Sequence, residues 1–352
     1  MRPFASATPA SRIVFVPGAA DRAGAEAERA GLQRVLVVAS GSGKAVADRV
    51  QAVLGARFAG RFDDAVPHVP EPVVQRAVSL ARQIGADGCV AVGGGSAVGL
   101  AKALALEAGL VVLAVPTTYA GSEMTPIWGR TADGRKTTGR DPRVLPVGVL
   151  YDPELSRTLP PLLSVVSGFN AIAHAVEGLY APDRSPLLDL AAAEGIRLML
   201  GALPTIVQTP SDPEARSDAL AAAWLCGSVL GATAMGLHHR ICHVLGGTWN
   251  LPHAETHTVV LPYVVALLAD AAPQMATAVG RAGGFDDPAA GLRERAGALG
   301  APTSLGELGL PLSAVDEVAR LVLERPIDHP RTVTPTEVQQ LVGRAIRGDS
   351  VR

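Results

Sequence analysis

The stretch GCVAVGGGSAVGLAKALAL, from Gly88 to Leu106, has the pattern of a buried strand that turns directly into a helix. A continuous apolar run precedes the glycines, and small and apolar residues recur at helical spacing after them. Glycines in such a turn let the backbone approach a pyrophosphate, and the N-terminus of the helix offers unpaired N–H groups. The turn Gly93-Gly94-Gly95-Ser96 is therefore a candidate dinucleotide site. The pattern is not GxGxxG, so a tight structural turn explains it equally well.

Other apolar runs of strand length occur in the first half of the chain, separated by segments with helical periodicity. Strands that alternate with helices predict a parallel sheet with helices on both faces. A polar, glycine-rich segment at 131–141 predicts a hairpin or a loop. The further predicted strands are RIVFVP (12–17), RVLVVAS (34–40), LVVLAVPTT (110–118) and PVGVLYDP (146–153), and helices are predicted near 21–30, 43–55 and 71–85.

After Asp152-Pro153 and Leu159-Pro160-Pro161 the strand signals nearly end, and helical periodicity continues to the C-terminus. We place a domain boundary near residue 157. The first domain, 1–157, is then an α/β nucleotide-binding domain, and the second, 158–352, is an all-α substrate and catalytic domain of about seven to nine helices. A cleft between the two domains is the expected ligand site.

The bulk properties exclude several kinds of partner. The 352 residues carry a formal net charge of −2, so no broad basic field is available to attract nucleic acid or anionic lipid. The apolar stretch 188–203 is interrupted by Asp189, Glu194 and Arg197, which indicates a buried helix and not a membrane span. The three cysteines form no CxxC pair and no signal sequence opens the chain, so we expect a cytoplasmic protein.

A second polar loop, Pro116 to Glu123, follows the strand after the glycine turn. Its hydroxyls can bind a phosphate or a ribose at the same sheet edge, although an ordinary turn rich in Thr and Ser has the same composition. After the strand at 34–40, the segment Ser40-Gly41-Ser42-Gly43 stands where dinucleotide folds often hold the adenosine ribose with an acidic residue. No carboxylate is present there, so we predict weak discrimination between NADH and NADPH.

The segment GLHHRICHVLGGTWNLPHAETH, Gly236 to His257, holds five of the chain's eight histidines. His239 and His243 are four residues apart, so on a helix they share one face. Asn170 and His174 repeat this spacing in an earlier predicted helix. This spacing predicts that imidazoles and an amide from separate helices meet at one point.

His253 follows Pro252 and would enter the same region from the next turn. Three histidines and the Asn170 amide are therefore expected to converge on a point that faces the nucleotide. His238 and His257 flank this set without matching its spacing, and hydrogen-bonded core positions are the simpler interpretation of both.

Five ordered motifs extend over nearly the whole chain: GGGSxxxxAK, PTTxxGSE, FNAIAHAVE, HHxxxHVLGG and LPHAETH. In this order and spacing they resemble the iron-containing alcohol dehydrogenase superfamily and, within it, the maleylacetate reductases. The resemblance implies a dehydroquinate synthase-like fold, with an N-terminal nucleotide-binding α/β domain and a C-terminal helical domain. It also implies hydride transfer between the two domains and a homodimer.

In the metal-dependent members of this superfamily an Asp and three His ligate a divalent ion. A neutral amide oxygen is a poor substitute for a carboxylate, so the affinity for Fe²⁺ or Zn²⁺ should fall sharply. Gly99 also stands where metal-dependent relatives usually carry Asp. The similarity to maleylacetate reductases implies an enzyme without a metal. The four ligand positions fall here on Asn170, where the Asp would be, and on His174, His239 and His253.

The resemblance implies reduction of the C=C bond of maleylacetate to 3-oxoadipate with NADH or NADPH, in the degradation of aromatic compounds. Hydride adds to the alkene carbon β to the ketone, negative charge develops on the ketone oxygen, and a proton reaches the α carbon. A protonated imidazole offers both charge and a hydrogen bond to that oxygen, as a metal does in the relatives. A site for this doubly anionic substrate therefore needs several cationic donors.

The expected roles follow from the resemblance and from this chemistry. His243 is the first candidate for the proton donor and His253 the second, His174 and His239 hold the substrate carboxylates, and Tyr119 adds a hydroxyl. On the cofactor side, the residues carried over are Gly93, Gly94, Gly95 and Ser96 at the pyrophosphate, Thr117, Thr118 and Ser122 at the nicotinamide-side phosphate and ribose, Ser40 near the adenosine, and Lys136 at a ribose hydroxyl or simply in a solvated loop.

Three other functions remain open. The closest is a metal-dependent alcohol dehydrogenase in which Asn170 serves as a weak ligand. A glycerol-phosphate dehydrogenase or a dehydroquinate synthase-like enzyme is more distant and also uses a metal. A non-catalytic NAD-responsive binding protein belongs to another class, and the converging imidazoles argue against it because a sensor has no need of several proton donors.

Overall fold

The computed structural model describes residues 11–132, 135–327 and 330–351, apart from the side chains of residues 42, 135 and 136. The described residues divide into two compact units, one within 11–159 and the other within 160–351. The sequence places the boundary near residue 157, in the short helix Pro153–Thr158 that ends just before this division.

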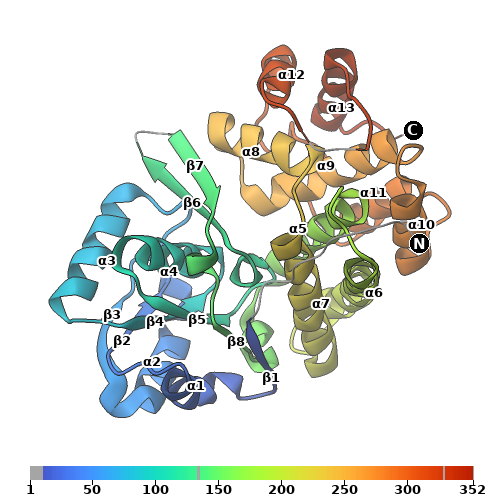
Figure 1. Cartoon of the computed structure of the whole chain (residues 1–352). Coiled ribbons are helices and arrows are strands. Elements are labelled where there is room, and N and C mark those ends of the chain that lie inside the picture. The colour runs from blue at the N-terminus through green and yellow to red at the C-terminus, as the bar shows by residue number, and fades with distance from the viewer. Residues whose placement is uncertain (1–10, 133–134, 328–329, 352) are drawn as a thin grey trace. The chain divides into compact units, whose positions relative to one another are not determined.

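The first unit is built on a sheet of six strands in the order β1-β8-β5-β4-β2-β3, and every pair of neighbours is parallel. Helices cover both of its faces (Figure 1). This is the architecture that the alternating strand and helix patterns predict. The elements are β1 Arg12–Phe15, α1 Ala23–Arg29, β2 Val35–Ala39, α2 Lys44–Leu54, β3 Phe58–Phe62, α3 Glu71–Gln83, β4 Gly88–Gly93, α4 Gly95–Ala108, β5 Val111–Pro116 and β8 Gly148–Tyr151.

Two strand features differ in how well the sequence predicts them. The edge strand β3 is missed, because FAGRF contains Gly60 and Arg61 and lacks a run of β-branched residues. The glycine-rich segment at 131–141 contributes to an antiparallel hairpin of β6 (Ile127–Ala132) and β7 (Arg135–Arg140), so the hairpin alternative is confirmed.

Side chains of the central strands alternate between two apolar cores. Val35 and Val37 of β2 join the core that includes residues of α1 and α2. Leu36 and Val38 of the same strand join the core that includes residues of α3 and α4. Because β2, β4 and β5 lie side by side, the segments that follow their carboxyl ends, 40–43, 93–96 and 117–123, lie at the same edge of the sheet.

The second unit is helical, and within its described residues it contains nine α-helices. Helix α5 is buried on all sides from Ser164 to Tyr180, and α9 contacts α5, α8, α11 and α13. The functional side chains described below lie on α5, α8 and α9. The helices are α5 Pro161–Tyr180, α6 Pro186–Gln208, α7 Pro213–Ala232, α8 Leu237–Trp249, α9 His253–Leu268, α10 Pro273–Gly283, α11 Pro288–Ala298, α12 Val315–Leu323 and α13 Pro335–Arg347.

Two helices of the described chain, α5 and α6, are long and apolar enough to cross a membrane by length and composition, and α7 with α8 is a bent pair that also passes this test. The apolar window of α5 is 89% buried inside the protein. Helix α6 carries the ion pairs Arg184–Asp189, made with the preceding loop, and Arg197–Glu194. The apolar window of α6, the helix that contains 188–203, is 44% buried, so the prediction of a buried helix is only partly right.

Candidate active site

The glycine turn and the segments around it are brought together at the carboxyl edge of the sheet. Gly93 has a φ of 142°, a conformation that favours glycine, and Gly94 is the N-cap of α4. A Cβ at Gly94 would lie 2.8 Å from side-chain atoms of Thr118, and one at Gly93 would lie 3.2 Å from Ser40 Oγ. The predicted cofactor residues Ser40, Gly93, Gly94 and Thr118 therefore line one small region in front of a helix N-terminus.

The second polar loop is fixed to this region through its backbone. The N–H of Thr117 donates to the carbonyl of Gly93 at 3.2 Å. Ser122 begins the short 3-10 helix Ser122–Met124. Tyr119, which lies between Thr117 and Ser122 in the sequence, is completely buried. The assignment of Tyr119 to the substrate stays a prediction. Lys136 belongs to β7, but its side chain lies outside those that the structure describes.

Lys102 on α4 binds the end of the second polar loop and the residues that follow it. Its Nζ donates to the carbonyls of Ser122 (2.6 Å), Thr125 (2.8 Å) and Ile127 (2.7 Å) and to Thr125 Oγ1 (2.9 Å). Burial lowers the pKa of Lys102 to about 7, and the nearby carboxylate of Glu123 opposes this shift. Four acceptors around one amine favour the ammonium, because it has three protons to donate. Lys102 is the last residue of the motif GGGSxxxxAK, and the motif alone does not indicate this role.

Replacing Lys102 with methionine should lower the free energy of unfolding by about 2–3 kcal/mol, because three buried carbonyl oxygens lose their donor. The loop that begins at Thr117 should also lose its anchor, so the KM for NADH should rise severalfold. Thermal unfolding and steady-state kinetics measure the two effects. Lys102→Arg is the matched variant that keeps the charge. A methionine variant with unchanged melting temperature and KM would contradict the anchoring role.

In the helical unit six imidazole rings form one continuous cluster. His239 on α8 stacks against His174 on α5, with ring centroids 5.1 Å apart and planes 25° apart. His243, one turn further along α8, lies 5.8 Å from His239 and 6.4 Å from His253, which is the first residue of α9. The structure therefore brings together His174, His239, His243 and His253, and Asn170 lies one turn before His174 on α5.

The treatment of His238 and His257 as core residues is only partly right. Both are completely buried, and His238 Nε2 and His257 Nδ1 share a hydrogen bond of 2.9 Å, as hydrogen-bonded core histidines would. However, the His257 ring lies 4.4 Å from that of His253 and 4.7 Å from that of His239. Residue spacing along α8 could not predict this contact, because His257 lies on a different helix, α9.

Glu177 is another residue of the site that the sequence analysis did not identify. Its Oε2 accepts a hydrogen bond from His239 Nδ1 at 2.5 Å, and its Oε1 accepts from the backbone N–H of His238 (2.8 Å) and of His239 (3.3 Å) and from Tyr180 Oη (2.5 Å). The carboxylate thus caps the N-terminus of α8, where N–H groups lack helical partners. It also fixes His239 with Nε2 as the ring nitrogen left for a ligand.

The charge of Glu177 is maintained inside the protein. Burial alone would raise the pKa of this carboxyl, but His239, through its charge and its hydrogen bond, lowers it to about 2. A signal for this residue was present in the sequence, since a single carboxylate in the apolar helix FNAIAHAVEGLY needs a buried partner.

Burial divides the cluster into an outer and an inner part. His243 and His253 are exposed, whereas His174 and His239 are only 3% and 5% exposed. Burial first, and then the neighbouring imidazoles, lower the pKa of His174 well below its usual value. Burial thus favours the neutral form of His174, and its expected role in holding a substrate carboxylate stays a prediction. A dianionic ligand beside it would shift this pKa upward.

Two polar atoms at the bottom of the cluster have no hydrogen-bond partner in the described structure: Asn170 Oδ1 and His174 Nδ1. Burying such atoms unpaired costs about 1–3 kcal/mol each. Both lie on the same face of α5, four residues apart. They are therefore the natural contacts of a polar ligand that enters beside His239.

The residues at the four metal-ligand positions do not fit an iron site well. Asn170 supplies a neutral oxygen, and no carboxylate belongs to the set. Among the described residues, the set of three His, Cys, Asp or Glu donors within 4.8 Å of one another is His238, Cys242 and His257, which is a different set. Asn170 with His174, His239 and His253 thus lacks the negative charge that a carboxylate ligand would supply.

The parallel sheet with its glycine turn and the helical unit with its clustered histidines are the two parts of a dehydroquinate synthase-like fold. A family model described as "Iron-containing alcohol dehydrogenase" matches residues 10–153, and a model for the C-terminal part of that family matches residues 164–346. The chain belongs to the iron-containing alcohol dehydrogenase family.

Within that family the chain is similar to proteins named maleylacetate reductase. The one from Sphingobium indicum is 48% identical over 96% of each chain. Among solved structures, maleylacetate reductase from Agrobacterium tumefaciens is 45% identical with a TM-score of 0.95, covering 99% of this chain and 100% of that one. The enzyme from a Rhizobium species is 46% identical with a TM-score of 0.94 and the same coverage. The family resemblance and the fold predicted from the motifs are confirmed.

Proposed function

We propose that the protein is a maleylacetate reductase that reduces the C=C bond of maleylacetate to 3-oxoadipate with NADH or NADPH, and that it does so without a metal. The observation that carries the proposal is the donor set: imidazoles and one amide cluster where metal-dependent relatives place an Asp and three His. The similarity to several proteins with this name, at about 47% identity over most of the chain, supports it.

The substrate carries two carboxylates and a ketone, so the site has to supply several hydrogen-bond donors. His239 is held by Glu177 at Nδ1, which leaves Nε2 for the substrate. His174 offers its unpaired Nδ1, and the amide of Asn170 can present its oxygen or, after rotation, its NH₂ group. These buried groups bind and orient the dianion, and its negative charge favours protonation of the imidazoles around it.

The reduced nicotinamide, when bound, supplies the hydride to the alkene carbon β to the ketone. Negative charge then develops on the ketone oxygen of the substrate, and imidazole N–H groups aimed at that oxygen stabilise it. The α carbon finally takes up a proton. His243 and His253 are suited to deliver it, because both are exposed and can recover a proton from water.

The decisive experiment for the function is a paired assay. Purified protein is mixed in separate reactions with maleylacetate, freshly prepared by hydrolysis of a dienelactone, and with a simple aldehyde. The consumption of NADH is followed by its absorbance at about neutral pH. We expect rapid turnover with maleylacetate and little with the aldehyde. The reverse ranking would indicate an alcohol dehydrogenase. The same assay with NADPH tests the weak discrimination expected from a segment at 40–43 that lacks a carboxylate.

Metal removal should leave the activity unchanged. After prolonged dialysis against a chelator, we expect at least nine-tenths of the original rate, and elemental analysis should find well below one equivalent of iron or zinc, because the donor set lacks a carboxylate. A stoichiometric divalent ion, with activity that falls on its removal and returns on its addition, would establish the metal-dependent alternative.

Asn170→Asp should move the site toward the metal-dependent form. The added carboxylate supplies the missing charge and hard oxygen, so affinity for Fe²⁺ or Zn²⁺ should rise by at least about tenfold, measured by titration calorimetry. The same negative charge beside a dianionic substrate should lower kcat/KM for maleylacetate by about 10-fold or more. Asn170→Ala is the control that removes the amide without adding charge. An aspartate variant that binds no metal and keeps full activity would refute the argument from the lost carboxylate.

A further inference from the structure

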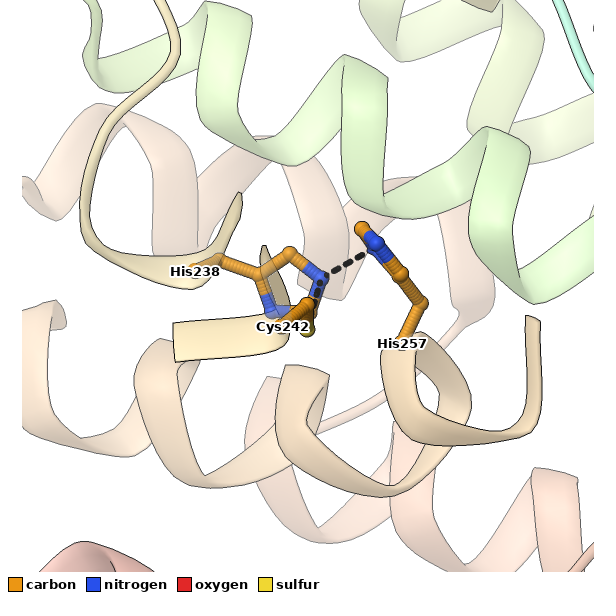
Figure 2. Close-up of side chains that lie close together, drawn as sticks. All are labelled: His238, Cys242 and His257. Carbon is orange, nitrogen blue, oxygen red and sulfur yellow. Dashed lines mark hydrogen bonds between the residues drawn. The ribbon is translucent and has the colours of Figure 1, made fainter. Parts of the chain in front are cut away.

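His257 is hydrogen-bonded to His238, which also contacts Cys242, and all three side chains are buried. Figure 2 shows His238 and Cys242 on α8 and His257 on α9, with ligand-type atoms directed toward one another. His238 Nε2 lies 2.9 Å from His257 Nδ1 and 3.7 Å from Cys242 Sγ. The remaining ring nitrogens, His238 Nδ1 and His257 Nε2, are buried without a hydrogen-bond partner.

A metal ion is not the best explanation of this trio. Two nitrogens bound to one tetrahedral zinc, each at about 2.0 Å, are separated by roughly 3.3 Å. The observed separation of 2.9 Å is that of a normal hydrogen bond between nitrogens. The trio also offers three donors in a buried place, where a metal site needs a fourth. The two imidazoles are therefore joined by a shared proton.

The shared proton has a consequence for the free nitrogen of His257. A neutral imidazole carries one N–H and one lone pair. If His238 Nε2 donates the proton, His257 Nδ1 is the acceptor and its N–H is on Nε2. If His257 Nδ1 donates instead, His257 Nε2 is a bare lone pair. The bond to His238 thus decides whether His257 presents a donor or an acceptor to its surroundings.

The surroundings of the His257 ring are the site itself. Its centroid lies 4.4 Å from the ring of His253, 4.7 Å from that of His239 and 6.4 Å from that of His174. These are the rings at three of the four positions where relatives hold a metal. Nε2 of this completely buried ring has no hydrogen-bond partner among the described residues, so it is available to bind a ligand of the site.

We propose that His257 is a further substrate-binding residue, whose Nε2–H donates a hydrogen bond to an anionic oxygen of the substrate, and that His238 is a positioning residue that keeps the proton on that nitrogen. The inference rests on the proposed reduction of a dicarboxylate. A negatively charged ligand selects the tautomer with His238 Nε2 as donor, because a bare lone pair on His257 Nε2 would repel it.

Two substitutions of His257 separate binding of the substrate from a purely structural role. The amide of Gln occupies roughly the place of the imidazole Nε2, and the amide of Asn occupies roughly the place of Nδ1. His257→Gln keeps a donor for the substrate, whereas His257→Asn keeps only the bond to His238. We expect His257→Asn to lower kcat/KM for maleylacetate by about 10–100-fold, mostly through KM, and His257→Gln to lower it by no more than about fivefold.

His238 is tested in the same way. His238→Gln keeps an amide donor at the position that bonds His257 Nδ1 and should keep most of the affinity for substrate, whereas His238→Asn removes that donor and should raise KM for maleylacetate by about 10-fold. Cys242→Ala is the matched control: it removes the third member of the trio and should leave kcat/KM within about threefold of wild type.

The results for these variants distinguish a role in substrate binding from a purely structural role. The KM for NADH and the melting temperature of each variant are measured together with kcat/KM, so that loss of folding is recognised. Wild-type turnover of maleylacetate tests the function itself, and its absence would refute the proposed function independently of any variant. If the wild type is active, retention by His257→Asn with loss in His257→Gln would overturn our inference in favour of a structural bond. Equal activity of both variants with the wild type would overturn it as well.

Discussion

Replacement of His243 by alanine is expected to lower kcat/KM for maleylacetate by about 10²–10⁴-fold, the usual contribution of a positioned proton donor. His243 is exposed on α8 and its ring is stacked, at 19°, with that of His253. An exposed imidazole can gain a proton from water between turnovers, which the buried His174 does poorly because burial lowers its pKa. The measurement is steady-state kinetics with NADH, combined with the solvent deuterium isotope effect on kcat.

The loss should be chemical and not structural. Since His243 lies at the surface of its unit, the alanine variant should unfold within about 0.5 kcal/mol of the wild type. His253→Ala is the matched variant, and it should show the smaller rate loss if His243 is the donor. Loss in His253→Ala with a nearly normal His243→Ala would exchange the two roles. Wild-type rates in both variants would mean that the proton comes from elsewhere.

Much of the first unit could be predicted from local sequence because its signals are local. The strands around 88–96 and 110–118 are continuous apolar runs, and the glycines after the first of them mark the turn that the structure places at the sheet edge. Strand β3 was not predicted because Gly60 and Arg61 interrupt its apolar pattern, and its strand conformation depends on pairing with β2.

The site was predicted in part for a similar reason. The pairs Asn170 with His174 and His239 with His243 show their common face through spacing along one helix. Contacts between residues of different helices cannot be recognised from spacing in the sequence. His257 reaches His239 across the α8 and α9 packing, so its place in the cluster depends on tertiary structure.

The roles of the buried charged residues could not be predicted from the sequence either. Lys102 is the only basic residue of α4 and Glu177 the only carboxylate of α5, and their partners include backbone groups and side chains from distant segments. A buried charge implies a partner without identifying it. In this chain, both of these buried charged residues lie in apolar helices beside a motif and hold neighbouring segments through hydrogen bonds.

Glu177→Gln should lower kcat/KM for maleylacetate by about 100-fold while the protein still folds. The amide oxygen can continue to accept from the N–H groups of His238 and His239, so α8 keeps its cap. The amide NH₂ then faces His239 Nδ1, and two donors cannot pair. His239 must give up the Nδ1 proton or rotate, and its Nε2 is no longer presented as Glu177 presents it.

Glu177→Ala should lower the stability of the protein as well as its activity. It leaves two backbone N–H groups, the hydroxyl of Tyr180 and the ring of His239 without their acceptor, which should cost about 3–5 kcal/mol of stability. Glu177→Asp retains the charge on a shorter arm and serves as the control. The comparison separates the two duties of one carboxylate: the alanine variant should lose melting temperature and activity together, whereas the glutamine variant should lose mainly activity. If glutamine restored both to wild-type values, the orientation of His239 would have no part in catalysis, and Glu177 would serve only as the cap of α8.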